Sequence, residues 1–212
     1  MPPHQYRKKR SPARRTRTRK LKRYLIVSED SKSSLDYFLS FPVDKTRVEV
    51  VPEGGAGNTI SVVQRGVELQ EIAKKEGNPF IHVYCVFDRD NFPIQRYQQA
   101  FELENQHTDL TAVWANECFE LWYLLHFAYH DTGIGRHDLM NRLKTKNRLG
   151  HVYQKNDDQL YNELVDKLDA AINNASKLLY EAKKRSPQRF WDENPSTNIQ
   201  ELVLKLRDLN DL

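Results

Sequence analysis

Apolar positions divide the first 130 residues into alternating strand and helix segments. Unbroken apolar runs predict strands at 23–28, 48–51, 80–87 and 110–115. Runs without polar alternation are typical of parallel strands covered on both faces. Apolar residues spaced three or four apart predict helices at 31–40 and 59–75, from residue 92 onward, and at 116–127. This alternation predicts an α/β fold with a parallel-rich sheet between flanking helices.

From about Asp131 the strand signals fade and the pattern becomes helical. It predicts a short basic helix or loop at 139–149 and a long helix at 157–185 with one apolar stripe. A last helix opens at Asn198, where Glu201 three residues later has the form of a capping box. We expect three parts: a disordered basic arm at 1–22, an α/β core at 23–130, and a helical C-terminal extension at 131–212 packed on that core.

Charge is distributed unevenly along the chain. Residues 1–23 hold eleven Lys or Arg and no acid, while the whole chain has a net charge of +4. Subtracting the +11 of residues 1–23 from the +4 of the whole chain leaves −7 for residues 24–212. Like-charge blocks are typical of segments that bind nucleic acid through counterion release, although a solubilising tail is the alternative.

A second group of cations lies between Arg136 and Lys155, where a solvated basic face is the alternative to a nucleic-acid track. From the arm and this second patch we take nine candidate nucleic-acid contacts: Arg14, Arg15, Arg17, Arg19, Lys20, Lys144, Lys146, Arg148 and Lys155.

Several classes of protein are disfavoured by what the chain lacks. No apolar run approaches the roughly 20 residues that span a bilayer. The basic first segment has no apolar stretch of the kind found in secretory signals. Cys85 and Cys118 are far apart and have no zinc-type spacing. We therefore expect a cytoplasmic protein without membrane contact.

Carboxylates follow two of the predicted strands. Glu29 comes just after the first strand, and Asp88 and Asp90 follow the strand at 80–87. Ligands of open α/β sheets bind beyond the carboxyl ends of the strands. Alternate residues of an extended segment point the same way, so Asp88 and Asp90 can face one point. Three hard oxygen ligands suit Mg²⁺ or Mn²⁺ better than zinc, and we expect these three acids to share such an ion.

Two further residues are candidate helpers of this site. Lys32 stands at a predicted helix start and could neutralise a phosphate, or it could be a plain surface lysine. Glu120 follows another strand end, where it could act as a further ligand or a base; the alternative is a first-turn acid favoured by the helix dipole. The candidate catalytic set is therefore Glu29, Asp88, Asp90, Glu120 and Lys32.

Glu29 followed later by Asp88-Arg89-Asp90 resembles the carboxylate pattern of Toprim domains. The wider pattern resembles the RloB-like family of bacterial defence proteins. The segments that carry this likeness are residues 25–29, 37–38, 87–92, 116–127, 153–156 and 194–198. The family often has glycine after the first-strand glutamate, where this chain has Asp30. Asp30 could be an extra ligand or could alter metal affinity.

The resemblance implies a Toprim-like fold and Mg²⁺-dependent cleavage of nucleic-acid phosphodiesters, with RNA, and transfer RNA in particular, ahead of DNA. It also implies a role in abortive infection against phage and control by a partner ATPase of the ABC/AAA type; a homodimer is left open. Two alternatives remain. One is a non-catalytic nucleic-acid-binding or regulatory subunit whose acids hold a structural ion. The other is a Toprim enzyme of another kind, such as a primase or a topoisomerase-like strand transferase.

Overall fold

The computed structural model describes residues 20–30, 32–90, 93–152, 154 and 159–210. Five of the predicted nucleic-acid contacts lie outside these residues: Arg14, Arg15, Arg17, Arg19 and Lys155. The predicted start of the long helix, at 157, also lies outside them.

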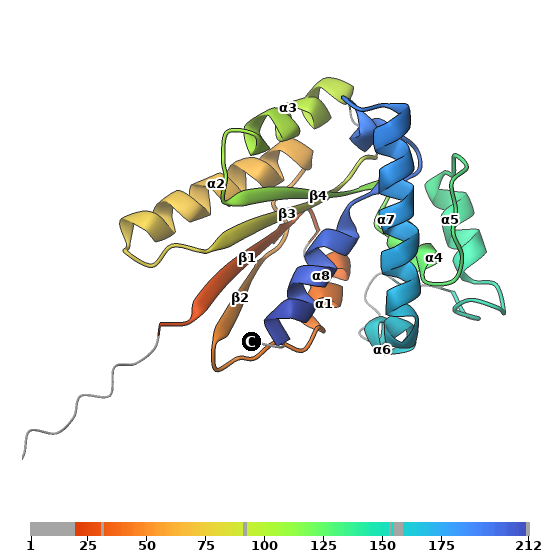
Figure 1. The fold of residues 1–212 in the computed structure, drawn as a ribbon, viewed down its shortest axis with the longest axis horizontal. Coiled ribbons are helices and arrows are strands. Elements are labelled where there is room, and N and C mark those ends of the chain that lie inside the picture. The colour runs from red at the N-terminus through yellow and green to blue at the C-terminus, as the bar shows by residue number, and fades with distance from the viewer. Residues whose placement is uncertain (1–19, 31, 91–92, 153, 155–158, 211–212) are drawn as a thin grey trace, which may run out of the picture.

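A five-stranded sheet forms the centre of the described chain (Figure 1). Its strands, in spatial order, are β2 (Val48–Glu53), β1 (Lys22–Ser28), β3 (His82–Asp88), β4 (Leu110–Asn116) and β5 (Ser196–Thr197). The first four run parallel, and β5 pairs antiparallel with β4. The connection after β1 leads to β2 on one side of it, and the connection after β2 crosses over β1 to β3 on its other side. The carboxyl ends of β1 and β3 are therefore the switch point at which sheets of this kind bind ligands.

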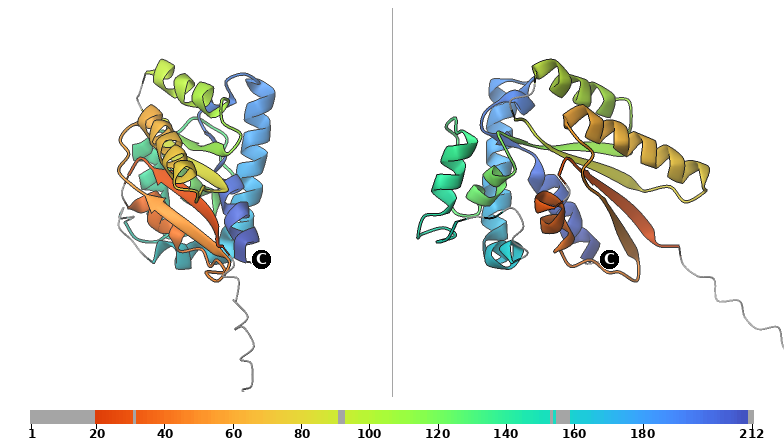
Figure 2. Two further views of the ribbon diagram at one scale, coloured as in Figure 1. Left: turned by 90° about the vertical axis from the view of Figure 1, so that its left-hand side faces the viewer. Right: turned by 180° about the vertical axis from the view of Figure 1, so that it is seen from behind.

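Helices cover both faces of this sheet (Figures 1 and 2). The helices of the described chain are α1 (Ser33–Leu39), α2 (Thr59–Lys75), α3 (Ile94–Glu104), α4 (Glu120–Leu125), α5 (Arg136–Leu143), α6 (Leu160–Leu164), α7 (Leu168–Arg185) and α8 (Ile199–Asn210). Single 3₁₀ turns occur at η1 (Val165–Lys167) and η2 (Phe190–Asp192). The α/β class, the mostly parallel sheet, the flanking helices and the C-terminal helix are as predicted, and they are consistent with a Toprim-like fold.

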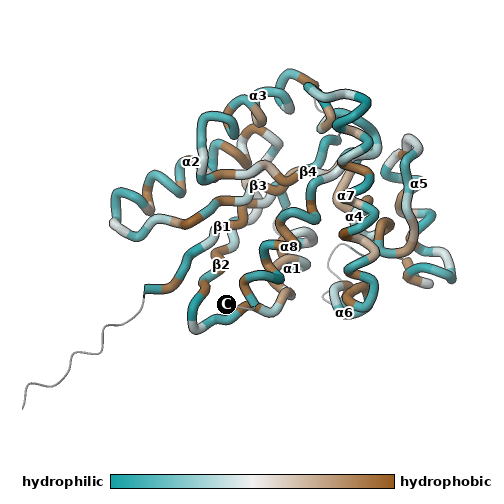
Figure 3. The backbone as a smooth tube through the Cα atoms, in the orientation of Figure 1, coloured by the Kyte–Doolittle hydropathy of each residue, from teal (hydrophilic) through white to brown (hydrophobic). Residues whose placement is uncertain are grey.

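Alternating side chains of the buried strands supply two apolar cores. Tyr24 and Ile26 of β1 face a core shared with α1, α4, α7 and α8. Leu25 and Val27 face the core under α2 and α3. Figure 3 shows the strands as largely hydrophobic, whereas the surface helices alternate between polar and apolar residues. Burial on both faces explains why these strands read as unbroken apolar runs.

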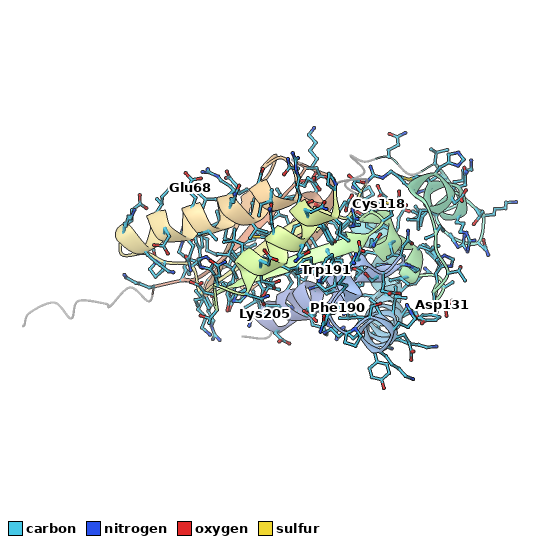
Figure 4. All side chains as sticks on the ribbon, turned by 90° about the horizontal axis from the view of Figure 1, so that it is seen from above. Glu68, Cys118, Asp131, Phe190, Trp191 and Lys205 are labelled. Carbon is cyan, nitrogen blue, oxygen red and sulfur yellow. The ribbon has the colours of Figure 1, made fainter. Side chains whose placement is uncertain are left out.

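Aromatic side chains close the second core beside the C-terminal segment. Trp191, labelled in Figure 4, stacks on Phe101 of α3 with ring centroids 5.0 Å apart. Phe101 also meets Trp114 of β4 edge to face at 5.3 Å. Residues near 190 are thereby fixed against the sheet although they are far from it in sequence.

Three local predictions for the second half of the chain were wrong. The segment predicted as 157–185 is divided into α6, η1 and α7. Its apolar stripe is still buried at Leu160, Leu164 and Leu168. The 3₁₀ piece is a single turn of three residues between Leu164 and Leu168, so it leaves both leucines buried and the apolar spacing does not reveal the break. The helix predicted at 116–127 is shorter, since β4 extends to Asn116 and α4 begins only at Glu120.

The third wrong prediction concerns Asn198, which does not cap α8. Its Oδ1 accepts a hydrogen bond from the Trp114 amide at 2.9 Å, and its Nδ2 donates to the Ala112 carbonyl at 2.8 Å. The side chain continues the pairing that β5 begins along β4. The predicted helical extension, for which no strand was expected, thus adds the short strand β5 to the sheet, because a buried β4 edge needs hydrogen-bond partners.

Candidate functional site

The carboxyl ends of β1 and β3 bring two of the predicted acids together. Glu29 directly follows β1, and Asp88 is the last residue of β3. The Glu29 amide donates to the Val86 carbonyl at 3.1 Å, so strand pairing continues up to the acid. The Glu29 side chain then accepts a hydrogen bond through Oε2 from the Asp88 amide at 3.2 Å. The sheet itself therefore sets the position of the Glu29 carboxylate.

Asp88 and Asp90 contact the same partner, although Asp90 lies in a turn and not in the extended segment that the alternation assumed. Both carboxylates contact the guanidinium of Arg136, at 3.1 Å from Asp88 Oδ2 and by a closer contact with Asp90 Oδ1. The intervening Arg89 turns away and pairs with Asp192 at 2.9 Å. Asp90 has a positive φ of 41°, which aspartate tolerates better than most residues.

These residues line a pocket of about 220 Å³ that also includes Ser28, Asp30, Ser34 and Phe119. Its walls are mostly polar or charged, and the charge is acidic. A single sugar-phosphate group fits a hollow of this size, which is smaller than the roughly 300–1,000 Å³ of typical small-molecule sites.

Burial and crowding perturb the acids of this pocket. Burial raises the pKa of Glu29 from its usual 4.5 to about 7, and the Asp90 and Asp30 carboxylates add to the increase. Burial, followed by the nearby Glu120 and Asp90, raises the pKa of Asp88 well above its usual value. Arg136 acts in the opposite direction on both. The site therefore favours any cation that can approach its oxygens.

Glu120 reaches this acidic group from the other side of β4. It is the first residue of α4 and is only 3% exposed. It lies close enough to Asp88 to raise the pKa of that carboxyl. Glu117, three residues earlier, accepts the Asp90 amide through its backbone carbonyl at 3.2 Å. The structure thus gathers Glu29, Asp88, Asp90 and Glu120 around one region.

The other predicted helper, Lys32, does not line the pocket. It stands at the start of α1 with an exposed side chain. Its backbone amide donates to Asp30 Oδ1 at 3.3 Å, and the Ser34 hydroxyl donates to the same oxygen at 3.4 Å. Asp30 therefore organises the turn into α1, which is a physical reason for an acid at the position where the resemblance led us to expect glycine.

Arg136 is the residue that sequence reasoning misplaced. It was grouped with the second cationic patch, whereas the structure places it in the acidic pocket. Ser28 and Ser34, whose hydroxyls lie 2.7 Å apart, were also missed as lining residues. Arg136 lies 46 residues after Asp90 among other basic residues, and nothing in the sequence pattern connects the two.

The remaining predicted cations lie away from the acids. Lys20 precedes the amino end of β1 and approaches the Gly77 carbonyl at 3.5 Å. Seven strand residues at about 3.3 Å each place it roughly 20 Å or more from Glu29. Lys144 and Lys146 are exposed just after α5, and Arg148 donates to the Arg142 carbonyl at 2.8 Å. Eight residues of α5, at about 1.5 Å each, separate these cations from the pocket by roughly 12 Å.

The donor set suits a hard divalent cation, although the acids are not arranged around one. Within the described ranges, no three His, Cys, Asp or Glu side chains are grouped closely enough to hold a metal ion. Asp88 and Asp90 instead share a guanidinium, and Glu29 is bonded to backbone. All the ionisable oxygens are carboxylates, which is the chemistry of Mg²⁺ or Mn²⁺ rather than zinc.

Comparison with protein families matches residues 24–206 to RloB-like protein. The chain belongs to the RloB-like family. No curated protein and no solved structure matches it. The matched segment of this RloB-like protein contains every described pocket residue from Ser28 to Arg136 and excludes the basic residues 1–23. No helix of the described residues is long and apolar enough to cross a membrane.

Proposed function

We propose that this RloB-like protein is a metal-dependent nuclease that cleaves phosphodiesters, in RNA before DNA, as an effector of bacterial defence against phage. One observation carries the proposal. Two adjacent parallel strands deliver Glu29 and Asp88 to the switch point of the sheet, and Asp90 joins them in one acidic pocket. This is the placement that Toprim-like phosphodiester chemistry requires, and the pocket has room for one phosphate group.

Glu29, Asp88 and Asp90 are the residues that would hold Mg²⁺ or Mn²⁺, and Glu120 is close enough to assist. Bound there, the ion would neutralise phosphate charge and lower the pKa of a bound water. Burial, and after it the neighbouring Glu120 and Asp90, raises the pKa of Asp88, which supports this assignment because like-charged buried carboxylates are stabilised by an added cation.

Protein side chains supply the rest of the chemistry. The Asp88 amide donates a hydrogen bond to Glu29 Oε2 and so holds one oxygen of this carboxylate in a fixed position. Lys144, Lys146 and Arg148 offer an exposed basic surface about 12 Å from the pocket for neighbouring phosphates. The arm, tethered at the opposite end of β1, would hold a more distant part of the nucleic acid.

The biological part of the proposal rests on the resemblance within the family. It predicts that a transfer RNA is the first substrate to test, that an ABC/AAA-type ATPase holds the nuclease inactive, and that phage infection releases it. An acidic pocket of modest size, with an arginine across two of its acids, is compatible with an effector that is silent until activated.

A non-catalytic nucleic-acid-binding subunit is the second candidate. One observation favours it: Asp88 and Asp90 are already paired with Arg136, and the described acids form no ready-made ligand group. In that case the carboxylates would be structural and the basic surfaces would carry the function.

Cleavage of labelled transfer RNA separates the two candidates. Purified wild type, Glu29→Gln and Asp88→Asn are incubated with Mg²⁺, alone and with the activated ATPase partner. Glu53→Gln is the matched control, since Glu53 ends the neighbouring strand β2 but pairs with Arg65 at 2.9 Å outside the pocket. We expect cleavage by wild type and the control only. Equal behaviour of all four proteins under both conditions would eliminate the nuclease.

A further inference from the structure

Arg136 occupies the position of a cation between two acids of the pocket. Its Nη2 lies 3.1 Å from Asp88 Oδ2 and also contacts Asp90 Oδ1. The three side chains are 36%, 22% and 34% exposed, respectively. Arginine remains charged at any physiological pH, so it cannot leave these carboxylates by losing a proton. A cation that binds the same carboxylates can displace it.

The backbone that carries Arg136 is held firmly in place. Just before it, Ile134 and Asn194 exchange two hydrogen bonds, from the Ile134 amide to Oδ1 at 3.1 Å and from Nδ2 to the Ile134 carbonyl at 3.2 Å. Leu139 and Leu143, on the inner side of α5, are fully buried. A fixed backbone and a long, partly exposed side chain mean that the guanidinium can move while the helix stays.

The charges of the pocket favour such an exchange. One guanidinium faces the acids Asp88 and Asp90, with Glu29 and Glu120 close enough to perturb Asp88. A divalent ion carries twice the charge and can contact several carboxylates at once. The displaced guanidinium would remain at the mouth of the pocket, where its planar fork of donors matches phosphate oxygens.

We propose that Arg136 is an exchangeable counterion: it binds Asp88 and Asp90 while the metal is absent, is displaced when a divalent cation binds, and then contacts a non-bridging oxygen of the nucleic-acid phosphate. This inference rests on the proposed nuclease function and adds a substrate-positioning residue to it. The exchange couples binding of the divalent cation to binding of the phosphate, since the cation frees the arginine that then contacts the phosphate.

Mn²⁺ binding, followed by the spin-resonance signal of the free ion, tests the first half without any measurement of activity. Arg136→Gln removes the competing charge and keeps a polar side chain. Arg142→Gln is the matched control, because Arg142 lies on the same helix but contacts His130 rather than the acids. We expect Arg136→Gln to bind Mn²⁺ about two- to fivefold more tightly than wild type, the upper part of the range for a partly exposed ion pair. The control should match wild type. Arg136→Lys, which retains one positive charge, should fall between them and also serves if the glutamine variant does not fold.

Binding of a short, non-cleavable 2′-O-methyl RNA tests the second half. In wild type, Mn²⁺ should tighten RNA binding, and in Arg136→Gln most of that gain should be lost. Equal gains in both proteins would overturn the phosphate contact.

The outcomes distinguish this inference from the function on which it rests. If Arg136→Gln binds Mn²⁺ no more tightly than wild type, while Asp88→Asn loses binding, the exchange is wrong and the metal site stands. If neither wild type nor Arg136→Gln binds Mn²⁺, both the exchange and the metal-dependent function fail. Mn²⁺ binding by Arg136→Gln but not by wild type would strongly support the exchange.

Discussion

Replacing Glu29 with glutamine is expected to stabilise the metal-free protein at pH 8 although it destroys the proposed site. Glutamine has nearly the same shape, and its carbonyl oxygen can accept the same hydrogen bond from the Asp88 amide that Glu29 accepts at 3.2 Å. The change removes only the charge that is costly to bury in an acidic pocket.

The sign and size of this effect follow from the pKa of Glu29. Burial raises that pKa from 4.5, its value in an unfolded chain, to about 7. Between these values the folded state binds more protons than the unfolded state, so wild-type stability falls as the pH rises from about 4.5 to about 7. At about 1.4 kcal/mol per pH unit the upper bound is about 3 kcal/mol, and solvent screening reduces the expected gain to about 1–2 kcal/mol.

Urea denaturation followed by tryptophan fluorescence measures this difference between pH 4 and pH 8 in EDTA. The gain of Glu29→Gln over wild type should be near zero at pH 4, grow through pH 5–7 and then level off. Added Mg²⁺ should reverse it, since an ion that binds only the wild-type fold stabilises that fold. Glu53→Gln should instead be slightly less stable than wild type, because it removes the ion pair between Glu53 and Arg65. A Glu29→Gln protein less stable than wild type at pH 8 would refute the reasoning.

Three further changes test the fold and the basic surface. Gly66→Ala should lower the free energy of unfolding by about 1–2 kcal/mol in urea, because a Cβ there would lie 2.7 Å from Cys85 Sγ; adding Cys85→Ala should recover part of the loss, and no recovery would contradict the clash. Asn198→Ala should lower the free energy of unfolding by about 2–3 kcal/mol in the same measurement, because it removes the side-chain partners of the Trp114 amide (2.9 Å) and the Ala112 carbonyl (2.8 Å) in β4. The double change Lys144→Gln/Lys146→Gln should reduce the slope of log affinity for single-stranded RNA against log salt by about 1.4, and an unchanged slope would exclude these lysines from the interface.

Local signals were sufficient to predict the centre of the fold. The buried strands β1 and β3 were predicted to within two residues at each end, because central parallel strands are apolar on both faces. Acids follow the same strands, and Asp88 and Asp90 do meet at one guanidinium, although through a turn at Asp90 and not through the extended alternation that was assumed. Strand order at the switch point then brings Glu29 to them.

Long-range contacts were beyond prediction from the sequence. Arg136 reaches the pocket from a segment that is held by hydrogen bonds between Ile134 and Asn194, which is 60 residues further along the chain. Asn198 looked like a helix cap because caps and strand partners use the same side chain. Its actual role depends on a buried edge of β4 whose hydrogen-bonding groups need partners, and no local pattern reveals that edge. Residues whose function depends on such contacts carry no periodicity by which they can be recognised.

Affinity cleavage by Fe²⁺ in place of Mg²⁺ is the most direct test of a metal held by Glu29, Asp88 and Asp90. With ascorbate and peroxide, a bound Fe²⁺ generates radicals that cut the nearest backbone, and mass spectrometry locates the cuts. We predict cuts in wild type near residues 28–30, 88–90 and 117–120, suppressed by excess Mg²⁺ and absent in Asp88→Asn. Cuts elsewhere in the chain, or the same cuts in Asp88→Asn, would contradict a metal site formed by these acids.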